Sequence, residues 1–385
     1  MSIDRFNLKS KLPNVPTSIF SVMSELAFKH NAINLSQGYP NFESSLELKQ
    51  LVNKAMLNGK NQYAPMPGIF SLRKIISKKM ESLYNAGYHP ENEITITAGA
   101  TQAIFTAIAA TVNLGDEVLI FKPAYDSYEP TVKLFGGKVI SYQLNPETFD
   151  INWEDVKGLI TSKTKMVIIN TPHNPSGKVL SKKDMLCLEN LLKGTSIVLL
   201  SDEVYEHIIF DGEQHQSAAL FPDLAKRAFI TASFGKTFHN TGWKIGYCLA
   251  PKALMKEFQK VHQFNVFSVN HPMQVGLAKY MENPDTYLEL GSFYQKKRDL
   301  FLNLMKDSKF EFTPSKGTYF QLMSFKNIAK ENDFDFAVRL IKEKGVASIP
   351  ISVFNENNLD TKVLRFCFAK TDDTLKKAAD ILCKI

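Results

Sequence analysis

A repeated alternation of short apolar runs and helical segments, extending from residue 93 to about residue 251, sets the strongest limit on how this chain folds. The runs are ITITAG, EVLIFK, KVISYQL, KMVIIN, SIVLLSDE, RAFITAS and GYCLAP. A turn and a helical segment follow most of them, which is typical of parallel strands joined by helical crossovers. Several runs are apolar at successive positions, as expected for strands that helices cover on both faces. The pattern predicts a large α/β domain.

The rest of the chain predicts a second, smaller domain. The 385 residues exceed the roughly 250–300 residues at which a single hydrophobic core stops growing. We assign residues 1–45 to an N-terminal arm that joins the small domain, 46–285 to the large domain and 286–385 to a C-terminal α+β domain. The segment TYLELGSFYQKKRDLFLNLM predicts a long helix at the boundary. The loop NQYAPMPG should be exposed, because its prolines and glycine cannot continue a helix.

Composition argues against several functional classes. The net charge is +7, but the basic residues are scattered and form no tract for a nucleic acid. The four cysteines form no CxxC pair, so we expect neither a zinc site nor a disulfide framework. No apolar run approaches the roughly 20 residues that cross a bilayer, and the N-terminus does not resemble a signal peptide. We expect a cytoplasmic protein with no metal and no membrane contact.

Lys236 is the first candidate for chemistry, because it lies just past the end of the predicted strand RAFITAS. Ligands of open α/β sheets bind beyond the carboxyl ends of the strands. An isolated lysine is usually a surface residue, but Ser233 and Thr237 beside it favour a polar site. The letters GKT also suggest a nucleotide-binding loop, yet that motif needs a glycine where this chain has Ile230.

Asp202 ends the run SIVLLSDE, and Tyr205 follows three residues later. A metal site would recruit Glu203, Glu206 or His207, but these side chains cannot all face one point with Asp202. A cationic partner is therefore favoured. The protonated pyridine nitrogen of pyridoxal 5′-phosphate (PLP) is such a cation.

Further candidates follow other predicted strands. Ala100 and Thr101 open a helix whose free N–H groups would favour a phosphate. Asn174 lies in a rigid turn, and Tyr125 could stack on a planar ring. Arg365 lies in the apolar run VLRFCFA, where a buried guanidinium implies a carboxylate partner. Taken alone, Asn174 is explained by a plain turn, Ala100 and Thr101 by a simple strand-to-helix turn, and Tyr125 by a place in the core.

In this order and spacing, these motifs resemble those of the class I and II aminotransferases, which are PLP enzymes of fold type I. The resemblance runs from NLSQGYPNF to LRFCFAK. Within the family, the chain is similar to the kynurenine aminotransferase and glutamine transaminase K group, and in particular to its bacterial methionine aminotransferases. The motifs that carry this are NLSQGYP, NQYAPMPG, TAGATQA, DSYEP, NTPHNPSG, ISVF and SFGKTFHNTGWKIGYCLAP. The resemblance implies a mostly parallel seven-stranded sheet flanked by helices, plus a smaller α+β domain.

The resemblance also implies how PLP is held. Lys236 would bind the cofactor as a Schiff base and carry the proton between the substrate Cα and the cofactor. Asp202 would pair with the pyridine nitrogen. The other implied cofactor-binding residues are Ala100, Thr101, Tyr125, Asn174, Tyr205, Ser233, Lys244 and, from a second subunit of a homodimer, Tyr63. Lys244 stands where many aminotransferases have arginine, so the positive charge is retained.

Substrate residues are implied in the same way. Gly38, Asn174 and Arg365 would hold the α-carboxylate, and Phe20, Tyr39 and Phe267 would line the side-chain pocket. Ser268 stands where kynurenine-type relatives often have histidine, which disfavours a preference for kynurenine.

The implied activity is a ping-pong transfer of the amino group of methionine, or of an aromatic or large apolar L-amino acid, to a 2-oxo acid. Kynurenine–oxoglutarate transaminase, glutamine–phenylpyruvate transaminase and a PLP-dependent cysteine-conjugate or cystathionine β-lyase remain alternatives. A PLP-sensing transcription regulator is disfavoured, because only about forty residues precede the first core helix.

Overall fold

The computed structural model describes residues 9–385, and its centre is a seven-stranded sheet of order β2-β8-β7-β6-β5-β3-β4. The strands are β2 (Ile94–Thr97), β3 (Glu117–Lys122), β4 (Lys138–Gln143), β5 (Thr164–Asn170), β6 (Val198–Asp202), β7 (Ala228–Ser233) and β8 (Gly246–Leu249). The pairs from β7 through β6, β5 and β3 to β4 are parallel. Only β8 is antiparallel to its neighbours β2 and β7. The predicted mostly parallel sheet is confirmed.

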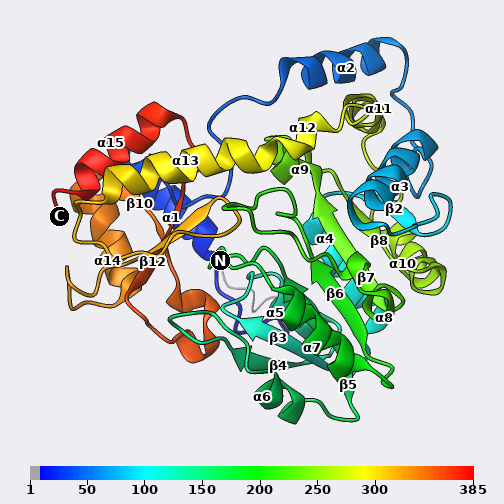
Figure 1. Ribbon diagram of the computed structural model, residues 1–385, viewed down its shortest axis with the longest axis horizontal. Helices are drawn as coiled ribbons and strands as arrows, with labels where there is room; N and C mark the ends of the chain where they lie inside the picture. The colour runs from blue at the N-terminus through cyan, green and yellow to red at the C-terminus, as the bar shows by residue number, and fades with distance from the viewer. Residues whose placement is uncertain (1–8) are drawn as a thin grey trace.

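Helices cover both faces of this sheet (Figure 1). The helices of the large domain are α2 (Leu46–Leu57), α3 (Phe70–Tyr84), α4 (Ala100–Thr111), α5 (Tyr128–Leu134), α6 (Trp153–Gly158), α7 (Lys182–Leu192), α8 (Pro222–Ala225), α9 (Phe234–Thr237), α10 (Lys252–Asn265) and α11 (His271–Tyr280). Of these, α2 packs against α11 and not against the sheet. Along β5, Met166 and Ile168 pack in one hydrophobic cluster, with α4 and α10, while Val167 and Ile169 pack in another, with α3 and α7. Side chains alternate between the faces of a strand, so two covered faces require the continuous apolar run seen in the sequence.

A second hydrophobic core lies at the other end of the molecule. It surrounds the antiparallel sheet β11-β12-β9, made of β9 (Phe320–Ser324), β11 (Ile349–Pro350) and β12 (Val363–Cys367). The short parallel pair β1 (Ile33–Asn34) and β10 (Val346–Ala347) lies beside it. The helices of this core are α1 (Ile19–Lys29), α13 (Leu290–Met305), α14 (Asp333–Arg339) and α15 (Asp372–Leu382), and Leu340–Lys344 form a π-helical turn. The short helix α12 (Asp285–Leu288) precedes α13, and its buried Tyr287 packs in the large-domain core.

Residues of the N-terminal arm belong to this second core. Met23 of α1 and Leu35 are both fully buried in it. Figure 1 shows α13 running from the large domain toward the small one. The single helix expected from TYLELGSFYQKKRDLFLNLM is interrupted at Glu289, between α12 and α13. The domain boundaries at residues 45 and 285 stay a prediction.

The register of the large sheet brings polar side chains together at one edge. Asn170, the last residue of β5, lies opposite Asp202, the last residue of β6. Ser233 ends the next strand, β7, and Lys236 follows in α9. The carboxyl ends of parallel strands are where open α/β sheets bind ligands.

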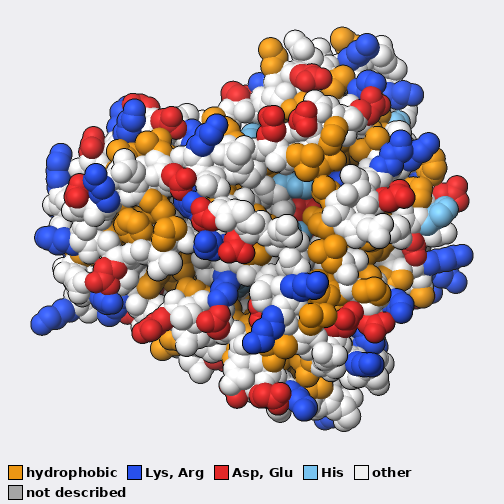
Figure 2. Space-filling view, viewed as in Figure 1, with side chains coloured by type: hydrophobic (Ala, Val, Ile, Leu, Met, Phe, Trp, Pro, Cys, Tyr) orange, Lys and Arg blue, Asp and Glu red, His pale blue; other side chains and the backbone are white. Residues whose placement is uncertain are grey.

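On the face drawn in Figure 2, acidic and basic side chains are interspersed, as the scattered charge in the sequence predicts. In residues 9–385, none of the helices has the length and apolar character needed to cross a membrane.

Candidate active site

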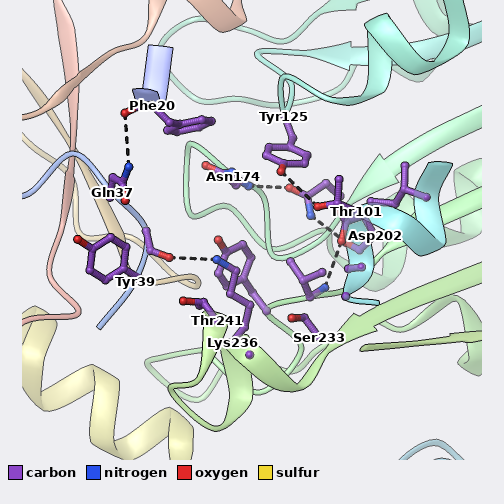
Figure 3. A pocket seen from close by; sticks show the side chains of 18 of the residues that line it. Phe20, Gln37, Tyr39, Thr101, Tyr125, Asn174, Asp202, Ser233, Lys236 and Thr241 are labelled. Carbon is purple, nitrogen blue, oxygen red and sulfur yellow. Dashed lines mark hydrogen bonds between the residues drawn. The ribbon is translucent and has the colours of Figure 1, made fainter. Parts of the chain in front are cut away.

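A pocket of about 320 Å³ lies between the large sheet and the small domain. It contains thirteen of the fifteen residues predicted from the sequence: Phe20, Gly38, Tyr39, Ala100, Thr101, Tyr125, Asn174, Asp202, Tyr205, Ser233, Lys236, Lys244 and Arg365. Figure 3 shows that Phe20, Gln37 and Tyr39 approach from one side, and Thr101, Tyr125, Asp202 and Ser233 from the other. Lys236 lies between the two groups.

The Lys236 amine points into this pocket. Its Nζ donates hydrogen bonds to the carbonyl oxygen of Gly38, at 3.0 Å, and to the hydroxyl of Tyr319, at 2.8 Å. The side chain is partly exposed to the pocket. Loss of hydration around the amine nevertheless lowers the pKa of Lys236 to about 8. A lysine with such a pKa is partly neutral near neutral pH and can act as a nucleophile or a base.

Asp202 is a buried carboxylate at the end of β6. Tyr128 donates a hydrogen bond of 2.5 Å to its Oδ2, and the N–H of Val204 donates one to its Oδ1. Burial raises the pKa of Asp202 to about 6. Within the described chain no cation forms an ion pair with this side chain. A cationic ligand in the pocket would stabilise the ionised carboxylate.

The N-terminus of α4 forms another wall of the pocket. Gly99, with φ of 78°, turns the chain from β2 into the helix, and among the described residues no side chain caps it. The first turn of a helix leaves its N–H groups without intrahelical partners. A Cβ added to Gly99 would lie 3.3 Å from the Nζ of Lys244, and one added to Gly246 would lie 3.0 Å from the N of Ala100. The free N–H groups of α4 and the amine of Lys244 thus border a region where Gly99 and Gly246 have no side chains. Such a region suits a phosphate.

Arg365 is 1% exposed, although it lines the pocket. Its Nη1 donates to the Oδ1 of Asn174 at 2.6 Å, and its Nη2 to the carbonyl oxygen of Ser36 at 3.0 Å. The guanidinium carbon lies 3.8 Å from the centre of the Phe320 ring. In residues 9–385 its Nε has no hydrogen-bond partner, and no Asp or Glu forms an ion pair with it. The carboxylate of Asp126 acts on the guanidinium electrostatically, but it forms no ion pair with it.

Tyr63 and Phe267 do not line the pocket of their own chain. They are 80% and 49% exposed, and their rings contact each other with centres 5.4 Å apart. The hydroxyl of Ser268 donates to the carbonyl oxygen of Ala64 at 2.9 Å and so joins the two loops that carry these rings. Phe267 does not line the pocket of its own chain, so its place in the side-chain pocket stays a prediction.

The sequence interpretation missed several residues that the structure places at the site. Tyr128, which bonds Asp202, follows Tyr125 by three residues, a helical spacing that could have indicated it. Asn170 ends β5 and donates to the backbone oxygen of Asp202. Tyr319 and Phe320 come from the small domain, and no local signal in GTYFQLM indicates that they contact Lys236 and Arg365.

Comparison with known proteins gives a consistent result over nearly the whole chain. The family model for aminotransferase class I and II matches residues 30–382. A methionine aminotransferase of Escherichia coli (strain K12) is 45% identical over 377 residues, which cover 97% of each chain. A kynurenine–oxoglutarate transaminase of Dictyostelium discoideum is 34% identical, covering 96% of this chain and 94% of the relative. A crystal structure of an Escherichia coli protein with a methionine aminotransferase function superimposes with a TM-score of 0.96 at 44% identity, covering 98% and 99% of the two chains. By these matches and by the geometry of its pocket, the chain belongs to the class I and II aminotransferases.

Proposed function

We propose that this aminotransferase uses PLP to move the amino group of methionine, or of a similar large apolar or aromatic L-amino acid, to a 2-oxo acid. The observation that carries the proposal is that Lys236 and Asp202 both line one pocket. A partly neutral amine and a carboxylate that forms no ion pair with residues 9–385 lie at the ends of neighbouring strands. These groups suit a ligand that has both a reactive carbonyl and a cationic ring nitrogen.

The residues of the pocket fit PLP. The carboxylate of Asp202 would hold the ring nitrogen, since it has no cation of its own in the described chain. The N-terminus of α4 and Lys244 would hold the phosphate, because their N–H groups and charge converge where Gly99 and Gly246 leave space. When bound, PLP accepts the electron pair that the substrate Cα releases.

The other residues would position the substrate and move its proton. Arg365 lines the pocket beside the amide of Asn174, and together these side chains can orient an α-carboxylate. Lys236 would accept the Cα proton, because a pKa of about 8 is close to the working pH of most enzymes. The hydroxyl of Tyr125 lies 3.4 Å from that of Thr101, so the aromatic ring stands beside the phosphate end of the pocket.

The preference for an apolar substrate rests on the pocket walls and on the relatives. Phe20, Tyr39 and Phe320 surround the region next to Arg365. Such walls favour a thioether or aromatic side chain over a charged one. The methionine aminotransferase relative, 45% identical, supports methionine. The kynurenine–oxoglutarate transaminase relative, 34% identical, makes kynurenine the second candidate.

We also propose that two copies of the chain form the enzyme. Tyr63 and Phe267 are large exposed aromatic side chains in adjacent loops. Exposed aromatic pairs of this kind are frequent at protein interfaces. Tyr63 would then complete the phosphate site of the partner copy.

The experiment is a panel of L-amino acids assayed with several 2-oxo acids, using the PLP-loaded protein and the Lys236→Ala variant as control. We expect the highest kcat/KM with methionine or an aromatic amino acid and none above background in the variant. Release of pyruvate and ammonia from cystathionine at a rate above transamination would replace the proposal with a β-lyase. A preference for aspartate would contradict the apolar pocket.

A further inference from the structure

Tyr319 belongs to the small domain, outside the motifs of the large sheet, and its hydroxyl contacts the amine of Lys236. It lies one residue before β9 and is fully buried. Its hydroxyl oxygen accepts a hydrogen bond from the Nζ of Lys236 at 2.8 Å. The same hydroxyl donates to the carbonyl oxygen of Gly38, which also accepts from Lys236. The amine therefore has two neutral acceptors that are themselves hydrogen-bonded to each other.

Packing fixes the position of these acceptors. The Tyr319 ring meets Tyr205 edge-on at 5.2 Å between centres, and it meets Phe320 edge-on at 5.0 Å. A Cβ on Gly38 would lie 2.6 Å from Phe320 and 3.3 Å from Tyr319, so the loop that carries the carbonyl is pressed against both rings. The hydroxyl cannot swing away from Lys236 without moving this aromatic cluster.

The charged groups around Lys236 explain why these neutral acceptors matter for stabilising its ammonium form. Arg365 and Lys244 lower the pKa of the amine, whereas Cys367 and Asp202 raise it, and burial has the largest effect. Tyr205 and Tyr319 place their rings 5.6 and 5.4 Å from Nζ. Asp202 is the carboxylate proposed to hold the cofactor nitrogen. The ammonium form of Lys236 thus depends on oxygen acceptors that carry no net charge.

We propose that the Tyr319 hydroxyl is a further catalytic group, which holds the Lys236 amine in its free, protonated form between the steps of the reaction. The inference rests on the proposed role of Lys236 as the proton carrier. When Lys236 takes the Cα proton, an N–H bond forms at Nζ and the C–H bond breaks, with its electron pair staying on the substrate side. The new ammonium needs acceptors at once, and the oxygens of Tyr319 and Gly38 are already in place.

Tyr319→Phe tests this, because it keeps the packed ring and removes only the hydroxyl. In the apoenzyme, competitive labelling with acetic anhydride across a pH series reports the pKa of the Lys236 amine. Losing an acceptor destabilises the ammonium, so we expect this pKa to fall by about one unit, which is about 1.4 kcal/mol. In the PLP-loaded enzyme we expect kcat to fall about tenfold with KM little changed, and the isotope effect of α-deuterated substrate to increase.

Tyr294→Phe is the matched control. Tyr294 is also fully buried, its ring lies 5.6 Å from that of Tyr319, and its hydroxyl bonds to the Nδ1 of His239 at 2.9 Å instead of to Lys236. It should leave the Lys236 pKa and the isotope effect unchanged. An unchanged Lys236 pKa in Tyr319→Phe, or equal shifts in both variants, would overturn the inference. The labelling needs no turnover, so its result is separate from the test of the proposed function, which measures the turnover of the unaltered enzyme.

Discussion

Replacing Arg365 with lysine separates a role in substrate binding from a role in stability. The guanidinium donates to the amide oxygen of Asn174 and to the carbonyl oxygen of Ser36 with two different nitrogens, and its buried Nε has no partner among residues 9–385. A lysine ammonium keeps the charge but cannot present a planar pair of donors to a carboxylate. The change should therefore remove one charge-assisted hydrogen bond to the substrate.

The expected size follows from that loss. A hydrogen bond to a charged group contributes about 1.5–3 kcal/mol. Since about 1.4 kcal/mol corresponds to a factor of ten, kcat/KM for methionine should fall by about 10- to 100-fold. PLP content should stay the same, because no residue proposed to hold the phosphate or the ring nitrogen changes.

Arg298→Lys is a control within the same chain. Arg298 is 3% exposed, as buried as Arg365, but its guanidinium forms ion pairs of 2.7 Å with Asp211 and Asp299. It should lower the melting temperature and leave kcat/KM of the folded enzyme near normal. Steady-state kinetics and thermal unfolding, measured on one preparation of each variant, give the comparison. A catalytically normal but unstable Arg365→Lys protein would remove Arg365 from the substrate site.

Four further outcomes are expected. Lys236→Ala should bind PLP without the covalent link and lose transamination by several orders of magnitude; an unchanged absorption spectrum or turnover would contradict the assignment. The active enzyme should sediment as a dimer, and a fully active monomer would refute the contribution of Tyr63. Burial raises the pKa of Asp202 from 3.8 to about 6, so the free protein loses stability as the pH rises from 3.8 to about 6 and does not regain it above that. Asp202→Asn should thus melt higher than the unaltered apoenzyme at pH 8, and the difference should shrink as the pH falls through 6; a pH-independent difference would refute this. Lys79→Met removes the ammonium that lies 2.5 Å from the buried carboxylate of Glu206, and it should lower the free energy of unfolding by about 3–5 kcal/mol. A loss below about 1 kcal/mol in a denaturant titration would show that the ion pair does not stabilise the fold.

The main sheet and most of the pocket could be predicted because their signals are local. Burial of both faces imposes the continuous apolar runs, and the polar residue that ends each run is then a candidate for the carboxyl edge of the sheet. Asp202 and Lys236 were found in this way. The direction of β8 was not, because an apolar run looks the same in a parallel and in an antiparallel strand.

The position of Phe267 shows a second limit. A resemblance assigns this residue to a substrate pocket, but whether a surface loop lines the pocket of its own chain or of a partner depends on assembly. The rings of Phe267 and Tyr63 contact each other, yet both side chains stay exposed in a single chain.

The sequence by itself therefore determined the α/β architecture, the edge of the sheet that carries the chemistry and the residue types present there. The tertiary structure alone decided the partners of those residues. Tyr319 lies 83 positions from Lys236, and Asn174 lies 191 positions from Arg365, yet each pair is within hydrogen-bond distance. Such contacts form only when the small domain packs against the sheet edge. The pKa of the amine and the orientation of the guanidinium depend on that packing, because burial and hydrogen-bond partners, which no local pattern specifies, set both.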